Sequence, residues 1–156
     1  MTNKALIAMS GGVDSSVAAF LTKDMGYDAT GITLKLFDNE DIGEKREKTC
    51  CSLDDIDDAR RVCLKLGIPY YVYNFKDSFK ENVIDRFIRA YENGTTPNPC
   101  IDCNRFIKFE KLIRRAEELD FDCVVTGHYS TIEYDKGADR YLLKKSVDRS
   151  EEHTSE

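Results

Sequence analysis

The chain has 156 residues, enough for one domain with a hydrophobic core but too few for two full domains. A hydrophobic content of 41% and a charged content of 33% are typical of a soluble globular protein, and no apolar run approaches the roughly 18 residues that a membrane span needs. The first apolar run is too short for a signal peptide, so we expect a cytoplasmic protein without a membrane partner. The net charge of −6 argues against nucleic-acid binding through bulk charge but leaves room for a local basic face.

Short apolar runs alternate with helical periodicities along most of the chain. The pattern predicts strands at residues 4–9, 27–37, 70–74 and 123–126, helices at residues 14–25, 52–66, 76–91 and 103–119, and a terminal hairpin at residues 131–134 and 141–145. This order predicts an α/β fold, a Rossmann-like parallel sheet with helices on both faces. Ligands of such sheets bind at the carboxyl ends of the strands, so we expect the site in the loops after the first, second and fourth strands.

Three predicted helices carry an apolar side. The expected apolar side chains are Val13, Val17, Phe20 and Leu21 in the first helix, Phe79, Val83, Phe87 and Ala90 in the third, and Phe106, Phe109, Ile113 and Ala116 in the last. The last helix also carries Arg105, Lys108, Lys111 and Arg115, which we place together on the side opposite its core. Such a face is usually only solvated, but beside a catalytic loop it could contact nucleic-acid phosphates.

A glycine- and serine-rich segment joins the first predicted strand to the first predicted helix. It consists of Ser10-Gly11-Gly12-Val13-Asp14-Ser15-Ser16. Glycines let the backbone approach an anion, and the helix N-terminus and serine hydroxyls add hydrogen-bond donors. Asp14 alone is a poor phosphate ligand and therefore suggests a bridging Mg²⁺. A plain capped turn is the alternative, but the full string indicates a nucleotide site that is neither a Walker loop nor a dinucleotide fingerprint.

A second constellation, Thr96-Pro97-Asn98-Pro99-Cys100-Ile101-Asp102-Cys103-Asn104, precedes the last predicted helix. Cys103 is placed at or near the helix start, where the helix dipole favours a thiolate. A zinc site shared with Cys50 and Cys51, or a redox pair that forms a disulfide, remains an alternative. Cys63 and Cys123 lie in apolar contexts and are expected to be structural.

In order and spacing, four motifs resemble the tRNA-specific 2-thiouridylase family of the ATP pyrophosphatase superfamily. They are Met9–Ser16, the segment from Thr96 to Asn104, Lys108-Phe109, and Thr126-Gly127-His128-Tyr129. The resemblance covers roughly residues 4–148 and implies an adenine nucleotide alpha hydrolase-like fold. It implies that ATP adenylates O2 of the wobble uridine of a tRNA, after which a cysteine persulfide supplies sulfur to C2 and AMP leaves.

The resemblance also assigns residues. Cys103 is the nucleophile, and Asp14 acts on Mg²⁺ and pyrophosphate. The implied ATP contacts are Ala8, Met9, Ser10, Gly11, Gly12, Val13, Asp14, Ser15, Ser16, Leu34 through its backbone, Gly127 and His128. The implied target-base and tRNA contacts are Asn98, Pro99, Cys100, Arg105 and Lys108. Cys100 stands where the family often has an acid, so Cys100 and Cys103 could instead be redox-linked or ligate an iron–sulfur cluster.

The implied partners are tRNA and a sulfur-donor protein, either a persulfide carrier or a cysteine desulfurase. We expect residues 1–148 to be the ATP-binding catalytic domain, without the family's central domain, its second cysteine and its C-terminal β-barrel. We expect residues 149–156 (RSEEHTSE) to be a non-native tail, since they resemble a translated sequencing adapter; a natural acidic tail is the alternative. Such a fragment should bind ATP weakly and not complete thiolation alone.

Two other functions fit parts of the sequence. One is another pyrophosphate-loop ligase, such as an amidotransferase synthetase, although such enzymes use ammonia and need no thiolate here. The other is a cysteine-cluster metal-binding or redox module in which the glycine loop is incidental. Stoichiometric zinc without ATP binding would favour the module.

Overall fold

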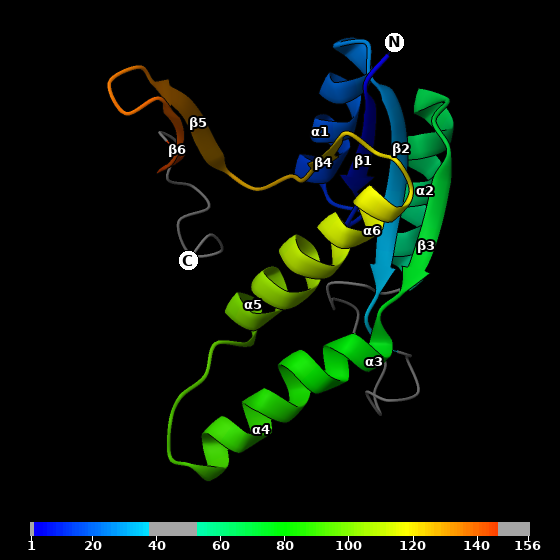
Figure 1. Ribbon diagram of the computed structural model, residues 1–156. Helices are drawn as coiled ribbons and strands as arrows, with labels where there is room; N and C mark the ends of the chain where they lie inside the picture. The colour runs from blue at the N-terminus through cyan, green and yellow to red at the C-terminus, as the bar shows by residue number, and fades with distance from the viewer. Residues whose placement is uncertain (1, 38–52, 147–156) are drawn as a thin grey trace.

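The computed structural model describes residues 2–37 and 53–146. Strands β1 (Lys4–Ala8), β2 (Asp28–Lys35), β3 (Tyr70–Asn74) and β4 (Cys123–Val125) form one parallel sheet in the order β3-β2-β1-β4 (Figure 1). The predicted α/β architecture is therefore confirmed. The chain moves outward from β1 to β2 and β3 and then returns to place β4 on the other side of β1. The strand order thus reverses between β1 and β4, which is where doubly wound sheets bind ligands.

Helices cover both faces of this sheet. Helices α1 (Val13–Asp24) and α2 (Leu53–Leu66) pack on one face through the core cluster of Ile7, Met9, Ala19, Ala29, Ala59 and Cys63. Two longer composite helices pack on the other face, around Leu6, Ile32, Leu34, Leu36, Val83, Ile107, Leu112 and Ala116. Consecutive β1 residues such as Leu6 and Ile7 enter opposite clusters because side chains alternate along a strand.

Both composite helices contain a π-helical stretch. The first comprises α3 (Lys76–Phe79), η2 (Lys80–Ile84) and α4 (Asp85–Glu92), and the second comprises α5 (Pro99–Asp102), η3 (Cys103–Lys111) and α6 (Leu112–Glu118). In the first, Val83 is buried and Phe79 packs against the same core, as expected. The pair extends past the carboxyl edge of the sheet, and the loop between them lies at its far end (Figure 1).

The π-helical stretch η3 corrects the predicted core side of the last helix. The buried residues are Ile107, Leu112 and Ala116, whereas Phe109 and Ile113 are exposed. A π-helix has more residues per turn than an α-helix, so the five-residue step from Ile107 to Leu112 keeps both on one side. The prediction is confirmed for Ala116 and wrong for Phe109 and Ile113, because it assumed a constant helical period of 3.6 residues.

The predicted apolar side of α1 does not face the sheet. The side chains of Val13, Val17, Phe20 and Leu21 are all between 46% and 77% exposed, whereas Ser15, Ala19 and Thr22 are buried. Small residues face the sheet because they let the helix lie close to it; Ala19 packs with Ala29 of β2 in the same cluster.

Strands β5 (Ser130–Asp135) and β6 (Arg140–Lys145) form an antiparallel hairpin, as expected, that stands away from the sheet (Figure 1). Several of its apolar side chains, among them Ile132 and Leu143, are exposed. Within the described ranges, no helix has both the length and the apolar character needed to cross a membrane. The expected tail at residues 149–156, the domain limit at residue 148 and the pair Cys50-Cys51 lie outside the described residues.

Candidate functional site

The glycine loop leaves the carboxyl end of β1 and turns directly into α1. Gly11 has φ +80°, in the left-handed region that favours glycine. A Cβ at position 11 would also lie 2.6 Å from the carbonyl oxygen of Asp55 in α2, so only glycine fits between the loop and α2. The backbone of the glycine loop therefore lies directly against α2.

The N-terminus of α1 is open to a ligand. Gly12 occupies the N-cap position, and no side chain caps the first turn of the helix. The N–H groups of the first helical turn have no partner within an α-helix, so this end offers donors and a positive dipole to an anion. Asp14 is exposed at the second position of the helix, beside these donors.

The serines of the loop have two roles. Ser15 is only 3% exposed, and its Oγ donates to the Gly12 carbonyl at 3.0 Å while accepting from the Ser10 N–H at 3.2 Å. Ser16 Oγ donates to the same carbonyl at 2.8 Å. We expected all three serine hydroxyls to donate to the ligand, but those of Ser15 and Ser16 donate to the loop itself. Ser10 is exposed, and its Oγ lies 3.2 Å from Ser15 Oγ.

The loop after β4 closes against the start of α1. A Cβ at position 127 would lie 2.7 Å from the backbone nitrogen of Ser15 and 2.9 Å from the carbonyl carbon of Asp14. Gly127 thus allows the two loops to touch at the reversal point of the sheet. The structure brings together two motifs, Met9–Ser16 and Thr126–Tyr129, that lie more than a hundred residues apart in the sequence.

Leu34 presents its backbone, not its side chain, to this edge of the sheet. Its side chain is buried in the core. The Met9 N–H donates to the Ile32 carbonyl at 2.7 Å, so Ile32 faces β1. Residues two apart in a strand direct their backbone groups to the same side, so Leu34 also faces β1, which ends at Ala8. The N–H and carbonyl of Leu34 therefore lie beyond the Ala8–Ile32 pair, the last pair of β1 with β2. A planar heteroaromatic ring could form hydrogen bonds with these two groups.

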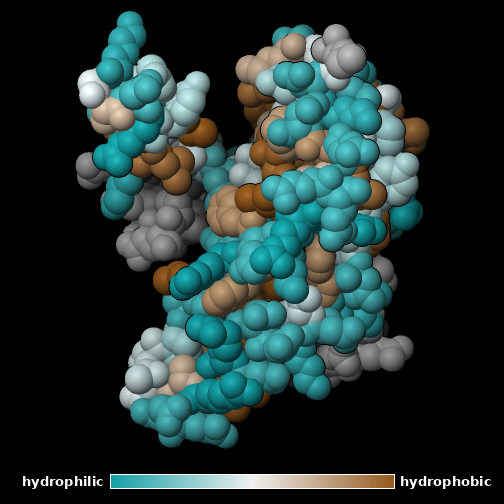
Figure 2. Space-filling model, viewed as in Figure 1, coloured by the Kyte–Doolittle hydropathy of each residue, from teal (hydrophilic) through white to brown (hydrophobic). Residues whose placement is uncertain are grey.

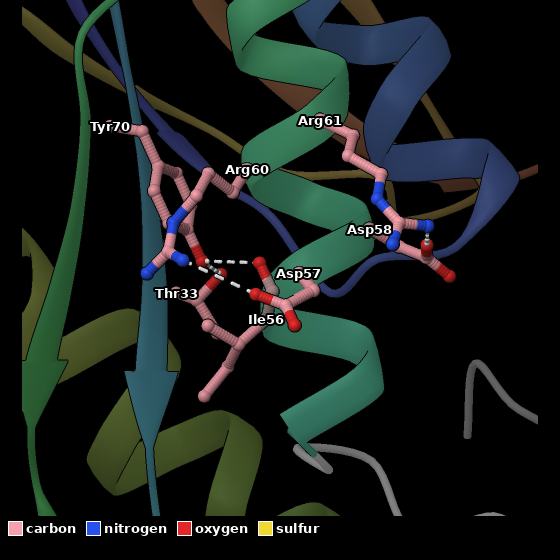
Figure 3. Close-up of polar contacts among 7 residues, drawn as sticks. All are labelled: Thr33, Ile56, Asp57, Asp58, Arg60, Arg61 and Tyr70. Carbon is pink, nitrogen blue, oxygen red and sulfur yellow. Dashed lines mark hydrogen bonds and ion pairs between the residues drawn. The ribbon is translucent and has the colours of Figure 1, made fainter.

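A partly buried hydrogen-bond chain supports the end of β1. The Tyr70 hydroxyl donates toward Thr33 Oγ1 at 2.7 Å and toward the Ile56 carbonyl at 3.2 Å (Figure 3). Thr33 Oγ1 in turn donates to the Met9 carbonyl at 2.9 Å. Burial raises the pKa of the Tyr70 phenol above its ordinary value. This support could not be predicted from the sequence, because alternating tyrosines in a strand carry no signal of a shared hydrogen bond.

His128 connects the loop after β4 to the helix that carries the cysteines. Its ring lies 5.3 Å from the ring of Phe109, and its Nδ1 lies 2.9 Å from Thr126 Oγ1. Burial, and secondarily the positive charge of Lys108, lowers the pKa of His128 below its ordinary value. Burial thus favours the neutral form of the His128 imidazole.

The cysteine loop starts a helix earlier than expected. Asn98 is the N-cap of α5, and its side-chain oxygen accepts from the Cys100 N–H at 3.0 Å. Pro99 takes the first helical position, which suits proline because its missing N–H would have no partner there. Cys100 therefore lies in the first turn, and Cys103 lies one turn further along. The prediction that Cys103 stands at the helix start is therefore wrong, because Pro99 begins the helix four residues earlier.

Cys100 is an exposed free thiol, and Cys103 is partly buried against the core. The expected disulfide between them is thus not present. Cys63 is fully buried, as expected, and burial raises its pKa to about 11. Cys123 is only partly buried, with a pKa raised mainly by burial. In residues 2–37 and 53–146, no three His, Cys, Asp or Glu side chains gather into a group that could hold a metal ion.

The basic residues of the last helix do not form the single face that we expected. Lys108 lies near His128, beside the β4 edge of the sheet. Arg105 lies over the Phe106 ring at 5.1 Å, and Arg86 of α4 approaches the same ring at 4.8 Å. Lys111 and Arg115 instead line a cavity beside β3, at the opposite edge of the sheet. The changed period of η3 again accounts for the difference.

The model of the tRNA methyl transferase HUP domain matches residues 3–155. The chain belongs to this family. Among curated members with similar sequences, the tRNA-specific 2-thiouridylase MnmA of Clostridium beijerinckii is 54% identical over 99% of this chain. The protein of the same name from Clostridioides difficile is also 54% identical over 99% of it. This HUP domain chain spans 42% of the length of each of these two relatives.

Solved structures share the fold of this HUP domain at low sequence identity. A glutamine-dependent NAD+ synthetase from Acinetobacter baumannii, in complex with ADP, aligns with a TM-score of 0.53 and 13% identity over 78% of this chain and 21% of that chain. A predicted subunit of tRNA methyltransferase from Methanocaldococcus jannaschii aligns with a TM-score of 0.52 and 17% identity, over 82% of this chain and 53% of that one. These similarities support the Rossmann-like α/β fold alone.

Proposed function

We propose that this chain is the ATP-binding part of a tRNA 2-thiouridylase, the part that adenylates the target uridine. One observation carries the proposal: an uncapped helix N-terminus follows a glycine loop at the strand-order reversal, and the Gly127 loop closes against it. This arrangement suits a pyrophosphate group. The sequence identity to tRNA-specific 2-thiouridylases supplies the substrate class.

In the proposed first step, O2 of the uridine attacks the α-phosphorus of ATP. The new O2–P bond forms as the bond from the α-phosphorus to the bridging oxygen breaks, and pyrophosphate leaves. The N–H groups of the glycine loop and of the first turn of α1 bind the pyrophosphate, and Ser10 adds a hydroxyl. The backbone of Leu34 binds the adenine ring. Adenylation makes O2 a good leaving group.

In the proposed second step, the outer sulfur of a persulfide on Cys103 attacks C2, and AMP leaves with O2. A second cysteine thiolate, which the family resemblance places outside this chain, then attacks the Cys103 sulfur, so that the S–S bond breaks and a disulfide forms between the two cysteines. 2-Thiouridine is released and N3 regains the proton that it lost on adenylation, and an external thiol reduces the disulfide. Cys103 matches the family motif because Asn104 and then Lys108-Phe109 follow it. The contact between Phe109 and His128 joins the helix that bears Cys103 to the loop that closes over the phosphates. We propose that this contact positions the sulfur relative to the activated base. Asn98, Pro99 and Cys100 would contact the base, and Arg105 and Lys108 the tRNA phosphates.

Mg²⁺ would neutralise the phosphate charge, with Asp14 and the phosphate oxygens as its ligands, which is the oxygen donor set that this ion prefers. An iron–sulfur cluster does not fit the described residues: they place Cys100 and Cys103 near each other in sequence but bring no third His, Cys, Asp or Glu ligand to them. Asn98 caps α5 by accepting from the Cys100 N–H. A sulfur-donor protein, either a persulfide carrier or a cysteine desulfurase, would load Cys103.

The test uses the full product of the gene, with Cys103→Ser and Cys100→Ser made separately and 2-thiouridine measured in tRNA. We expect thiolation to be lost with Cys103→Ser and retained with Cys100→Ser, while both variants still bind ATP. Unchanged thiolation in Cys103→Ser would overturn its role as the nucleophile. Loss of thiolation in both variants would favour a redox pair.

The rival proposal is another pyrophosphate-loop ligase that transfers ammonia. It predicts ATP binding without any effect of tRNA. Exchange of labelled pyrophosphate into ATP that requires unmodified tRNA supports the thiouridylase. Exchange that requires a carboxylate substrate instead supports the rival.

A further inference from the structure

A cavity of about 450 Å³ lies between β3 and α6, apart from the candidate site. Its floor comes from the carboxyl end of β3, including Tyr73, and its wall from Lys111, Arg114, Arg115 and Glu118. Figure 2, in the view of Figure 1, shows mostly hydrophilic residues over α6, which borders this cavity.

The charge of this cavity is opposite in sign to that of the whole chain. Three cationic side chains and one carboxylate line it, whereas the chain as a whole carries a net charge of −6. Lys111 takes part in no ion pair within the described residues. Among the described residues, the positive charge of Lys111 is therefore not neutralised by an ion pair.

Two arginines of the cavity are held in place by neighbours. The Arg115 guanidinium lies 5.5 Å from the centre of the Tyr73 ring and 2.8 Å from Glu118 Oε2. Arg114 lies 3.6 Å from Glu110, in a pair whose side chains are 69% and 45% exposed. Exposed pairs of this kind are weak, so Arg114 can exchange its carboxylate for a phosphate at little cost.

The cavity lies beside the edge strand β3, but at the carboxyl ends of the strands, the same end of the sheet as the candidate site. Tyr73 pairs with Leu34 in the β2–β3 register, and the Leu34 backbone faces the proposed position of adenine. Adjacent strands are roughly 5 Å apart, so one strand spacing separates the cavity from that backbone. A polynucleotide whose target base reaches the candidate site would have neighbouring phosphates within reach of this edge.

We infer that the cavity between β3 and α6 binds backbone phosphates of the tRNA substrate, through Lys111, Arg114 and Arg115. This inference rests on the proposed function and adds a contact surface to it. The Tyr73 ring, which lies under the Arg115 guanidinium, orients it, and Lys111 and Arg114 bind the phosphates directly. Removal of any one of these three cations should weaken tRNA binding regardless of sequence and reduce its salt dependence.

The experiment measures binding of an unmodified tRNA transcript to the full product of the gene, at several salt concentrations. We expect Lys111→Ala, Arg114→Ala and Arg115→Ala each to weaken tRNA binding by roughly five- to twentyfold and to lower the salt slope by about one. ATP binding should stay unchanged in each variant, which also shows that the protein is folded.

Arg60→Ala and Arg61→Ala are matched controls. These arginines lie on α2, on the opposite face of the sheet, in similar exposed pairs with Asp57 and Asp58 at 3.2 and 3.3 Å (Figure 3). Both controls should bind tRNA as the unsubstituted protein does. Equal losses in controls and cavity variants would mean a general charge effect and overturn the inference.

The remaining outcomes separate this inference from the proposed function. If the unsubstituted protein binds tRNA and the cavity variants bind it equally well, the inference is wrong and the proposed function stands. If the variants lose affinity for ATP instead, the phosphates bound here belong to a free nucleotide and the inference is also wrong. If the unsubstituted protein binds ATP but no tRNA, the proposed function fails together with the inference.

Discussion

Gly127 lies so close to Ser15 that a methyl group at position 127 would come within 2.7 Å of the Ser15 backbone nitrogen. That nitrogen belongs to the first turn of α1, the turn that offers hydrogen-bond donors to an anion. The contact joins the loop after β4 to the start of α1, on the two strands between which the strand order reverses. It predicts that no side chain larger than that of glycine fits at position 127.

We predict that Gly127→Ala lowers ATP affinity by at least about tenfold, because the backbone of the loop after β4 must move away from the phosphate-binding turn. Isothermal titration calorimetry with ATP measures the change. Gly137→Ala is the matched control, since the nearest atom to its added carbon is a carboxylate oxygen of Asp135 at 3.3 Å in the exposed hairpin. ATP binding of Gly127→Ala at the unsubstituted affinity would contradict the proposed closure.

We predict that Tyr70→Phe destabilises the fold by about 1 kcal/mol, because it removes hydrogen bonds to Thr33 and to the Ile56 carbonyl. Urea unfolding followed by circular dichroism measures the free energy of unfolding. Tyr71→Phe is the matched control; its side chain is exposed, so its stability should be unchanged. A Tyr70→Phe protein as stable as Tyr71→Phe would show that the hydrogen-bond chain has no net effect.

We predict that His128 makes the protein less stable in mild acid. Its pKa in the folded protein is below the ordinary value of 6.5, so as pH falls below about 6.5 the unfolded chain takes up a proton first and is favoured. The His128→Gln variant should lose this part of the pH dependence, which thermal unfolding between pH 7.5 and 5 measures.

NMR titration of the imidazole provides the control for this prediction. Lys108→Gln should raise the pKa of His128, because it removes a nearby positive charge, but not to the ordinary value, since burial is the larger cause. A pKa of His128 above its ordinary value in the unsubstituted protein would contradict the structure.

We predict that Asn98→Ala destabilises the start of α5 by about 1 kcal/mol, because the Cys100 N–H loses its cap. Amide hydrogen exchange at Cys100 should accelerate by roughly fivefold. Asn98→Asp keeps an acceptor at the cap and should exchange at nearly the original rate. Equal exchange in the Ala and Asp variants would mean that the cap does not order this loop.

Thiol labelling separates the cysteines. Cys100 is exposed, whereas Cys63 is fully buried with a pKa of about 11, so a soluble maleimide should modify Cys100 quickly and Cys63 only on unfolding. Mass spectrometry of the labelled, digested protein measures both rates. Equal labelling of Cys63 and Cys100 in the folded protein would contradict the packing of α2 on the sheet.

The α/β parallel sheet and the positions of the glycine loop and the cysteine loop could be predicted from the sequence, because strong local signals mark them. The paired glycines after an apolar run and the Pro-Asn-Pro segment before a helix each mark a loop at a definite place in the chain. Alternating strands and helices then place the loops at one edge.

Three features escaped prediction because they depend on tertiary contacts or on a departure from regular geometry. The π-helical η3 changes which side of the last helix faces the sheet and separates Lys108 from Lys111. The side of α1 that packs on the sheet was not predicted, because the helix lies so close to the sheet that the small Ala19 faces it and the larger Phe20 is exposed. The earlier start of α5 was missed because Asn98 was considered for base contact and not for capping.

The uncovered side of α1, with Val17, Phe20 and Leu21, has a practical consequence. Dyes such as ANS fluoresce on exposed hydrophobic surface, and their signal is commonly used to diagnose a molten globule. This chain presents such surface in its fully packed form. A bright ANS signal from the purified chain would therefore not show that the core is disrupted, and near-ultraviolet circular dichroism would be needed to judge whether the core is intact.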